Sequence, residues 1–387
     1  MTPFFEATFS DKDSAAPLGI IALPGAMELA KKIDERLIHF FGEAKTKGYL
    51  SKGTFLIDAS FPRFTSGDGK AIIHDSVRGK DLYIIADVGN HGITYNLMGR
   101  QIPMTPDEHF ADLKRVIGAC AGKPNRITVV MPLLYGSRQH RRGGRESLDC
   151  AMALQELYNM GVSDIITFDA HDPRVQNAVP LMGFDNFFPT YQILKALLNR
   201  YPDLNFSNNF MVVSPDEGAM TRNIYYASVL GVELGMFYKR RDYTKVVNGR
   251  NPIVAHEYIG SPVLGMDIFV ADDIIATGDS ILKLATELKE KGANRIFLSA
   301  TFPLFSEGVE KFDKAHSEGL FEAVLSTNLT YRIPELRQAP WFIESDLSKY
   351  IAYIIASCNF NESVGKLIDP IDKVKALLKR TQENREN

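Results

Sequence analysis

The chain has few cysteines and no long apolar segment. Its 387 residues include only Cys120, Cys150 and Cys358, which are widely separated. Three scattered cysteines cannot form a disulfide framework or a zinc site, so a reducing compartment is expected. No apolar run approaches the roughly 20 residues needed to span a bilayer, and residues 1–17 lack the basic start and apolar core of a signal peptide. We therefore expect a soluble, cytoplasmic protein.

The chain also lacks a large net charge. Its formal charge is −3 at pH 7, which provides no general attraction to nucleic acid or to a membrane surface, and neither partner is expected. Hydrophobic residues make up 45% and charged residues 24% of the chain, as in ordinary globular proteins. The length is sufficient for two domains of common size.

Short apolar runs alternate with amphipathic stretches along the chain. Such alternation predicts α/β domains, each with a mainly parallel sheet and helices on both faces. Two sets of these units occur, with a boundary near residues 185–190, and a helical tail follows. In the first set, strands are expected at 19–25, 81–88, 126–134 and 164–170, and helices at 26–41, 108–121 and 147–161. In the second set, strands are expected at 209–215, 233–239, 267–273 and 295–301, and helices at 190–201, 219–231 and 281–292.

The segment VADDIIATGDSI at residues 270–281 is the most informative motif. It predicts a buried strand, two adjacent acids, a tight turn and then a helix. Asp272 and Asp273 at the strand end can hold ribose hydroxyls or a hydrated divalent cation. Residues Ala276 to Ser280 can direct backbone N–H groups and two hydroxyls at a phosphate before a helix N-terminus. The alternative is an ordinary strand-to-helix connection with polar caps.

Acidic residues and a histidine follow two other predicted strands. Asp169, His171 and Asp172 lie after strand 164–170, where they can orient a phosphate or a magnesium ion; a histidine hydrogen-bonded within a loop is the alternative. Asp216 and Glu217 lie after strand 209–215 and can bind metal or ribose, or act as acidic caps of the next helix. In parallel sheets, ligands bind beyond the carboxyl ends of strands, where these residues are expected.

Two basic segments complete the pattern. YGSRQHRRGGRES at 135–147 contains four arginines, whose forked guanidinium groups suit polyphosphate; a solvated charged loop is the alternative. FYKRRDY at 237–243 opens a long segment to about residue 262 with little periodicity, which is typical of a lid. Lys239 and Arg241 alternate along an extended chain and can face one ligand, although a charged strand end is equally consistent.

Taken together, these segments resemble the ribose-phosphate pyrophosphokinases, or PRPP synthetases, in a divergent bacterial-type branch. The order and spacing match over roughly residues 19–370. The matching segments are PRFTSGDGK with SVRGKDLYII, PLLYGSRQH, FDAHDPRVQ, VVSPDEGAMTR, FYKRR, VADDIIATGDSI, ATFPLFSEG and ESVGKL. Each motif is weak alone, whereas the ordered set is specific.

The resemblance implies a fold of two phosphoribosyltransferase-like domains and an activity. The reaction would be magnesium-dependent transfer of the β,γ-diphosphoryl group of ATP to the 1-hydroxyl of ribose 5-phosphate, giving PRPP and AMP. The domains would span residues 1–187 on the ATP side and 188–335 on the ribose 5-phosphate side. Residues 336–387 would form a helical extension that packs on the N-terminal domain.

The resemblance also implies roles for individual residues. ATP would be held by Arg138, Gln139 and the Phe64 to Asp68 loop, Ser66 included, which in the family a neighbouring subunit offers. Catalysis would rest on Lys239, Arg241 and His171, and magnesium on His171, Asp216 and Asp169. The sugar would be bound by Asp272 and Asp273, and its 5-phosphate by Ala276, Thr277, Gly278, Asp279 and Ser280. The shared loop implies a homo-oligomer, at least a dimer, and hexamers are the family's usual form.

Several positions depart from the family pattern. Ser66 stands where aspartate is usual and Asp68 where glutamate is usual, and the 138–145 loop is one residue shorter. Ala276 replaces a common aspartate, and Asp279 replaces a small residue. An acid beside a phosphate is unfavourable unless its side chain points outward. The alternatives are a phosphoribosyltransferase, a diphosphokinase for another ribosyl compound, and a non-catalytic regulatory subunit.

Overall fold

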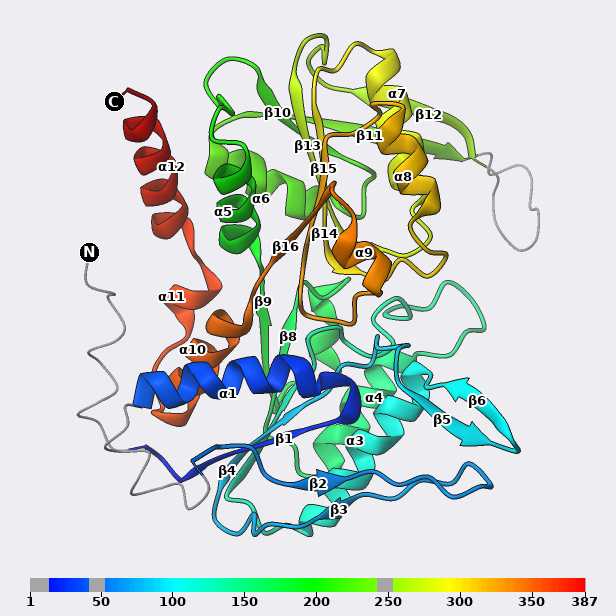
Figure 1. The fold of residues 1–387 in the computed structure, drawn as a ribbon, viewed down its shortest axis with the longest axis vertical. Coiled ribbons are helices and arrows are strands. Elements are labelled where there is room, and N and C mark those ends of the chain that lie inside the picture. Colours follow the sequence, from blue (N-terminus) through cyan, green and yellow to red (C-terminus); the bar gives the residue numbers. More distant parts are fainter. Residues whose placement is uncertain (1–13, 42–52, 242–252, 387) are drawn as a thin grey trace. The chain divides into compact units, whose positions relative to one another are not determined.

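The computed structural model describes residues 14–41, 53–241 and 253–386, drawn in colour in Figure 1. The chain forms two compact units. Unit 1 comprises Met1–Pro189, Asn328–Tyr331 and Asp346–Asp369, and unit 2 comprises Thr190–Thr327, Arg332–Ser345 and Pro370–Asn387. Among the described residues, no helix is long and apolar enough to cross a membrane.

Unit 1 is built on a five-stranded sheet in the order β1-β4-β7-β8-β9. Each neighbouring pair is parallel. The strands are β1 (Leu18–Ala22), β4 (Asp81–Ile85), β7 (Arg126–Val130), β8 (Asp164–Phe168) and β9 (Gly183–Phe187). Two hairpins accompany the sheet: β2 (Ala59–Ser60) with β3 (Ile72–Ile73), and β5 (Thr94–Leu97) with β6 (Arg100–Pro103). Because all five strands of the sheet run in one direction, their carboxyl ends share one edge.

Helices cover both faces of the sheet of unit 1. One face packs Leu82 and Ile84 against α3 (Pro106–Cys120) and α4 (Asp149–Asn159). On the other face, α1 (Met27–Phe41) and α10 (Ser348–Asn359) lie side by side, and Tyr350 of α10 packs edge-on against Phe168 and Phe187. The shorter helices are η1 (Pro24–Ala26), η2 (Pro173–Ala178) and α11 (Gly365–Ile368). Alternate residues of each strand therefore face two apolar layers, as expected for buried parallel strands.

Unit 2 contains a seven-stranded sheet in the order β12-β11-β10-β13-β14-β15-β16. Only the edge pair of β11 and β12 is antiparallel. The strands are β10 (Phe210–Ser214), β11 (Glu233–Arg241), β12 (Ile253–Ile259), β13 (Asp267–Ile275), β14 (Ile296–Pro303), β15 (Ala323–Thr327) and β16 (Phe342–Ser345). The two mainly parallel sheets with helices on both faces confirm the predicted fold class.

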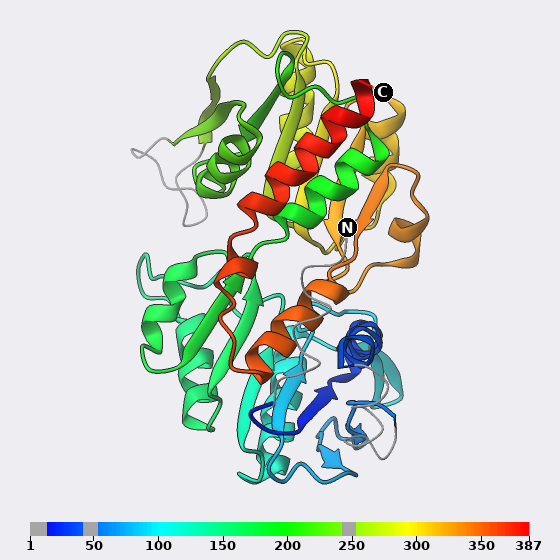
Figure 2. The same cartoon turned by 90° about the vertical axis from the view of Figure 1, so that its left-hand side faces the viewer.

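Each face of the second sheet also has an apolar layer. One layer joins strand residues such as Met211 and Val270 to α7 (Asp279–Glu290) and α8 (Glu310–Ser317). The opposite layer joins Val212 and Phe269 to α5 (Thr190–Arg200), α6 (Met220–Leu230) and α12 (Ile371–Glu386). Figure 2 shows α12 running beside α5. The short α9 (Pro334–Gln338) contacts β16.

Two expectations about the organisation of the chain differ from the structure. The C-terminal extension is divided between the units, because α10 and α11 belong to unit 1 whereas β16 and α12 belong to unit 2. Within the segment from 237 to about 262, which was expected to have little regular structure, residues 253–259 form β12 and pair with β11. The sequence did not predict this strand because IVAHEYI shows no strict alternation of apolar and polar residues.

Candidate active site

The Phe64 to Asp68 loop of unit 1 is a tight turn. The Phe64 carbonyl accepts the N–H of Gly67 at 2.9 Å, and the Phe64 N–H donates to the Asp68 carbonyl at 2.8 Å. The Ser66 hydroxyl donates to the Asp68 carboxylate at 2.8 Å. The Phe64 ring is 54% exposed, with the Lys70 ammonium 5.7 Å from its centroid. An exposed aromatic ring on an ordered turn is available to stack on a base.

The predicted arginine loop follows β7 at the carboxyl edge of the sheet. Gly136 has φ +65°, and its carbonyl accepts the N–H of Gln139 at 2.8 Å. The Gln139 amide donates to the Ser147 carbonyl at 3.0 Å, which closes the loop. The Arg138 side chain is exposed. The loop thus holds Gln139 in place and leaves the Arg138 guanidinium available for an anion.

The histidine segment follows β8, the neighbour of β7. His171 is exposed, and its ring centroid lies 5.3 Å from that of His140 in the arginine loop. His140 Nε2 lies 3.5 Å from an Asp172 oxygen. Arg174 donates to both oxygens of Asp172, and this contact, with His140 contributing, lowers the pKa of the Asp172 carboxyl to about 2. The structure therefore brings the two predicted loops of unit 1 together.

In unit 2, Asp216 follows β10 and precedes α6. Its Oδ1 accepts the N–H of Ala219 at 3.2 Å, and its carbonyl accepts the Ser214 hydroxyl at 2.8 Å. The buried Asn223 of α6 donates to the Ala271 carbonyl at 2.8 Å and accepts the Ala271 N–H at 3.1 Å. The Asp216 loop is thereby fixed beside β13, the strand that bears Asp272.

Asp272 and Asp273 lie within β13, which continues two residues beyond them. Asp273 is buried, whereas the Asp272 side chain is 32% exposed with Arg222 of α6 at 3.6 Å. Burial, followed by the negative charge of Asp273, raises the pKa of the Asp272 carboxyl. Because Asp272 is the more accessible of the two acids, it is the better candidate for a ligand contact.

The loop from Ala276 to Ser280 leads directly into α7. Gly278 has φ +86°, and a Cβ there would lie 2.2 Å from the Phe312 ring, so only glycine fits. The Ala276 carbonyl accepts the Ser306 N–H at 3.0 Å, which secures the back of the loop. The N–H groups that begin a helix have no intrahelical acceptor and favour anions. The α7 N-terminus therefore has the features of a phosphate site.

Asp279 lies beside this loop with its side chain directed outward. The carboxylate is 72% exposed and accepts from the Lys311 ammonium at 2.8 Å and from the Thr277 hydroxyl at 3.0 Å. The Lys311 contact, followed by that of Thr277, lowers the pKa of Asp279. The acid that departs from the family pattern is thus paired with Lys311, 32 residues later in the sequence, which also contacts Glu307 at 2.7 Å.

Lys239 and Arg241 lie near the end of β11. In the backbone register Lys239 pairs with His256 and Arg241 with Ile253, and a register shift occurs between Arg240 and Arg241. This irregularity interrupts the strict alternation expected from the sequence. The side chains of residues 239–241 and all of residues 242–252 lie outside the described residues. Their catalytic roles remain predictions.

The candidate magnesium ligands fit a metal that is bound mainly by its substrate. Among residues whose placement is described, no group of three or more acids, histidines or cysteines could hold a metal ion. His171 is exposed and Asp216 partly exposed, whereas Asp169 is buried with φ +44°. Magnesium usually keeps several waters and is bound through one or two carboxylates plus substrate phosphates. Within its own unit, His171 or Asp216 is accessible to such an ion, whereas Asp169 is buried.

Three residues of the candidate site were not assigned from the sequence. His140 and Arg222 lie inside motifs that the sequence analysis identified. The neighbouring motif residues could therefore have indicated that these two side chains belong to the site. Lys311 had no such signal, because it is distant in the chain from the loop that it supports. Only the fold brings α8 to the start of α7.

Both units match domain families of known proteins. Residues 18–161 match the N-terminal domain of ribose phosphate pyrophosphokinase, and residues 190–317 match the phosphoribosyl transferase domain. The ribose-phosphate pyrophosphokinase of Vibrio parahaemolyticus is 29% identical over 349 residues, which is 88% of this chain and 96% of that protein. That of Chlorobaculum tepidum is 27% identical over 91% of this chain and 93% of its own length.

A solved structure supports the fold. The phosphoribosylpyrophosphate synthetase of Mycobacterium smegmatis superposes with a TM-score of 0.71, covering 89% of this chain and 99% of that chain. Its sequence identity to this chain is 21%. At this identity the likeness establishes the shared fold alone.

Proposed function

Because the chain belongs to the ribose-phosphate pyrophosphokinase family, we propose that it transfers the β,γ-diphosphoryl group of ATP to the 1-hydroxyl of ribose 5-phosphate. The products are PRPP and AMP. One observation most supports ribose 5-phosphate as the acceptor. Asp272 lies on β13, and the next element, α7, begins with a loop that requires glycine at position 278 and has the features of a phosphate site. One unit thus offers a carboxylate for sugar hydroxyls and backbone donors for a phosphate.

The donor side is assigned to unit 1. Arg138 and Gln139 would bind the ATP phosphates and sugar, and the exposed Phe64 would stack on adenine, with Ser66 and Asp68 as hydrogen-bonding groups. In the family a neighbouring subunit offers this last loop, so we infer a homo-oligomer of at least two chains. The three cysteines are free, in keeping with the proposed cytoplasmic setting.

Phosphoryl transfer needs positioning and charge neutralisation more than covalent help. His171 and Asp216 would hold magnesium, with the buried Asp169 as the third predicted metal residue, and the ion, when bound, would neutralise phosphate charge. Asp272 would orient the ribose hydroxyls, with Asp273 buried behind it. Thr277, Gly278 and Ser280 would fix the 5-phosphate. Lys239 and Arg241 would stabilise the charge that develops on the transferred group, and the surrounding protein would exclude water.

The test is to incubate purified protein with ATP, magnesium and ribose 5-phosphate and to measure AMP and PRPP. We expect equal amounts of both. AMP with another ribosyl compound but not with ribose 5-phosphate would contradict the acceptor and retain the chemistry. No AMP with any acceptor would favour a regulatory subunit.

The Lys311 contact makes a separate prediction for the phosphate loop. Lys311→Ala leaves Asp279 uncompensated beside the bound phosphate, so KM for ribose 5-phosphate should rise roughly fivefold, since one exposed charge at about 4 Å costs about 1 kcal/mol. Asp279→Asn should change that KM by less than about twofold, because the carboxylate already points outward. Steady-state kinetics of both variants and of their combination measures this. If Asp279→Asn in the Lys311→Ala background fails to restore KM, the charge explanation is wrong.

A further inference from the structure

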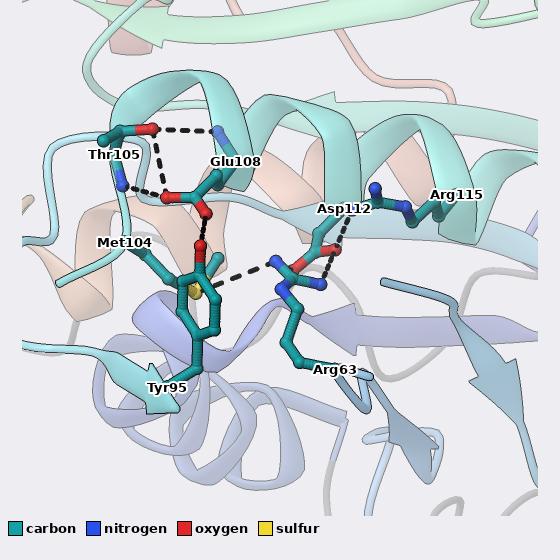
Figure 3. A network of polar contacts seen from close by, with 7 residues as sticks. All are labelled: Arg63, Tyr95, Met104, Thr105, Glu108, Asp112 and Arg115. Atoms are coloured by element: carbon teal, nitrogen blue, oxygen red, sulfur yellow. Dashed lines mark hydrogen bonds and ion pairs between the residues drawn. The ribbon is translucent and has the colours of Figure 1, made fainter. Parts of the chain in front are cut away.

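A buried ion pair lies directly beside the Phe64 to Asp68 loop. Arg63, the residue before the loop, donates from Nη1 and Nη2 to the two oxygens of Asp112 on α3, each at 2.7 Å. The Arg63 side chain is 8% exposed and that of Asp112 is 1% exposed. Arg115, one turn along α3, donates to the same carboxylate at 2.8 Å. Figure 3 shows the fork of Arg63 meeting Asp112.

The other end of the loop touches the same ion pair. Arg63 and Gly69 form an isolated antiparallel bridge, so the five loop residues project from one closed base. A Cβ at Gly69 would lie 2.1 Å from Arg63 Nη1 and 2.8 Å from Arg115 Nη1. The guanidinium groups therefore occupy the space that a side chain at residue 69 would need. Both ends of the loop are defined by the position of the Asp112 carboxylate.

A second set of contacts fixes the position of Arg63. Its guanidinium carbon lies 5.6 Å from the centroid of the Tyr95 ring on β5. The Tyr95 hydroxyl donates to Glu108, which also accepts from the Thr105 N–H at 2.8 Å in the capping box of α3. The first turn of α3 thus holds Tyr95 of β5 beside the arginine (Figure 3). A planar guanidinium bound at two oxygens and against a ring has little freedom to rotate.

We propose that Asp112 is a positioning residue for ATP: through Arg63 and Gly69 it sets the position of the loop that presents Phe64 to the adenine. The inference rests on the proposed function and extends it, because Asp112 is buried and touches neither substrate. Its effect reaches ATP through the loop and leaves the sugar contacts of unit 2 unchanged.

A second ion pair in unit 1, also formed with a buried aspartate, provides a control. Arg126 donates to Asp81 at 2.8 and 2.7 Å, and Asp81 is 1% exposed, as Asp112 is. This pair joins β4 and β7 and contacts the Cys358 carbonyl of α10, outside the loop. Replacing either aspartate by asparagine breaks a buried fork and destabilises unit 1. Only the change at Asp112 releases the base of the loop.

The experiment compares Asp112→Asn with Asp81→Asn in the full-length protein. For Asp112→Asn we expect KM for ATP to rise about tenfold or more, with kcat and the KM for ribose 5-phosphate within about twofold of the unaltered protein. Asp81→Asn should lower the melting temperature by a similar amount without this selective change. Equal changes in both KM values, or the same ATP effect in Asp81→Asn, would overturn the proposal.

Arg63→Lys decides the case if Asp112→Asn does not fold. Lysine keeps the charge but loses the fork, so we expect a smaller rise in KM for ATP, about threefold to fivefold, in a folded protein. An ATP KM that is unchanged in a folded Arg63→Lys would contradict a positioning role for the pair.

A fluorescence readout separates this inference from the proposed activity. The chain has one tryptophan, Trp341, which is buried, so Phe64→Trp adds a reporter at the loop. In that background, Asp112→Asn should lower the steady-state anisotropy of the exposed tryptophan, and Asp81→Asn should not. This holds even if the protein makes no AMP, in which case the proposed function fails alone. Unchanged anisotropy in Asp112→Asn would show that the carboxylate does not order the loop.

Discussion

Lys239→Ala should lower kcat by about a hundredfold to ten-thousandfold while leaving the fold intact, because a cation that stabilises the phosphoryl transition state contributes on this scale. Lys239 lies in the last part of β11, where its backbone pairs with His256 of β12. A positive charge at this strand end would stabilise the group being transferred in the transition state. It would contribute little to the binding of either substrate in the ground state. KM for ATP and for ribose 5-phosphate should therefore change by less than about threefold.

The control for this prediction removes an equal charge elsewhere in unit 2. Lys314 on α8 is 77% exposed and pairs only weakly with Glu318 at 3.9 Å, so Lys314→Ala should retain normal turnover. Lys239→Arg keeps the charge and separates its contribution from that of exact geometry. Turnover of Lys239→Ala within about threefold of the unaltered protein would remove Lys239 from the mechanism. Circular dichroism and melting temperature check that the variants are folded.

The sequence predicted most of the buried parallel strands, because such strands produce continuous apolar runs, but it did not predict the buried β15. The runs at 81–88 and 126–134 became β4 and β7, and the arginine loop follows β7 as expected. Hairpin β5–β6 and edge strand β12 were not predicted. The residues of β5, TYNL, form a short and partly exposed stretch in which neither alternation nor β-branched residues are strong enough to indicate a strand.

The contacts that complete the candidate site join residues that are far apart in the sequence, so local sequence patterns cannot predict them. Arg63 meets Asp112 across 49 residues, and Asp279 meets Lys311 across 32. Either acid alone resembles an ordinary charged helix residue. From the sequence, phosphate binding required the Asp279 side chain to point outward, but nothing showed that it does. In the structure, the contact with Lys311 holds it outward.

Asp272→Asn is expected to produce opposite changes in activity and in stability. The loss of a charged acceptor for the ribose hydroxyls should lower kcat/KM for ribose 5-phosphate about 10- to 100-fold, since hydrogen bonds to charged groups contribute about 1.5–3 kcal/mol. The same change should raise the melting temperature at pH 8 by a few degrees. Burial and the charge of Asp273 disfavour the ionised form of Asp272 in the folded chain, and asparagine has no charge to bury.

The direction of the pH dependence follows from the raised pKa. Well below pH 3.8, the ordinary value for aspartate, Asp272 is protonated in both the folded and the unfolded chain. As the pH rises above this value, the unfolded chain releases the proton first, so the free energy of unfolding decreases until the folded group also ionises. The contribution at pH 8 is on the order of 1–2 kcal/mol, discounted for the exposed third of the side chain and for Arg222 nearby.

Thermal unfolding of the unaltered protein and of Asp272→Asn between pH 5 and pH 8 measures this contribution. The difference in melting temperature should be smaller at pH 5 than at pH 8. Asp279→Asn is the matched control with the opposite sign, because Lys311 lowers the pKa of Asp279, so its replacement should not stabilise the protein at pH 8. If Asp272→Asn is less stable than the unaltered protein at pH 8, the Arg222 contact outweighs burial. If it is more stable and less active, the carboxylate is retained at a cost in stability because the sugar requires it.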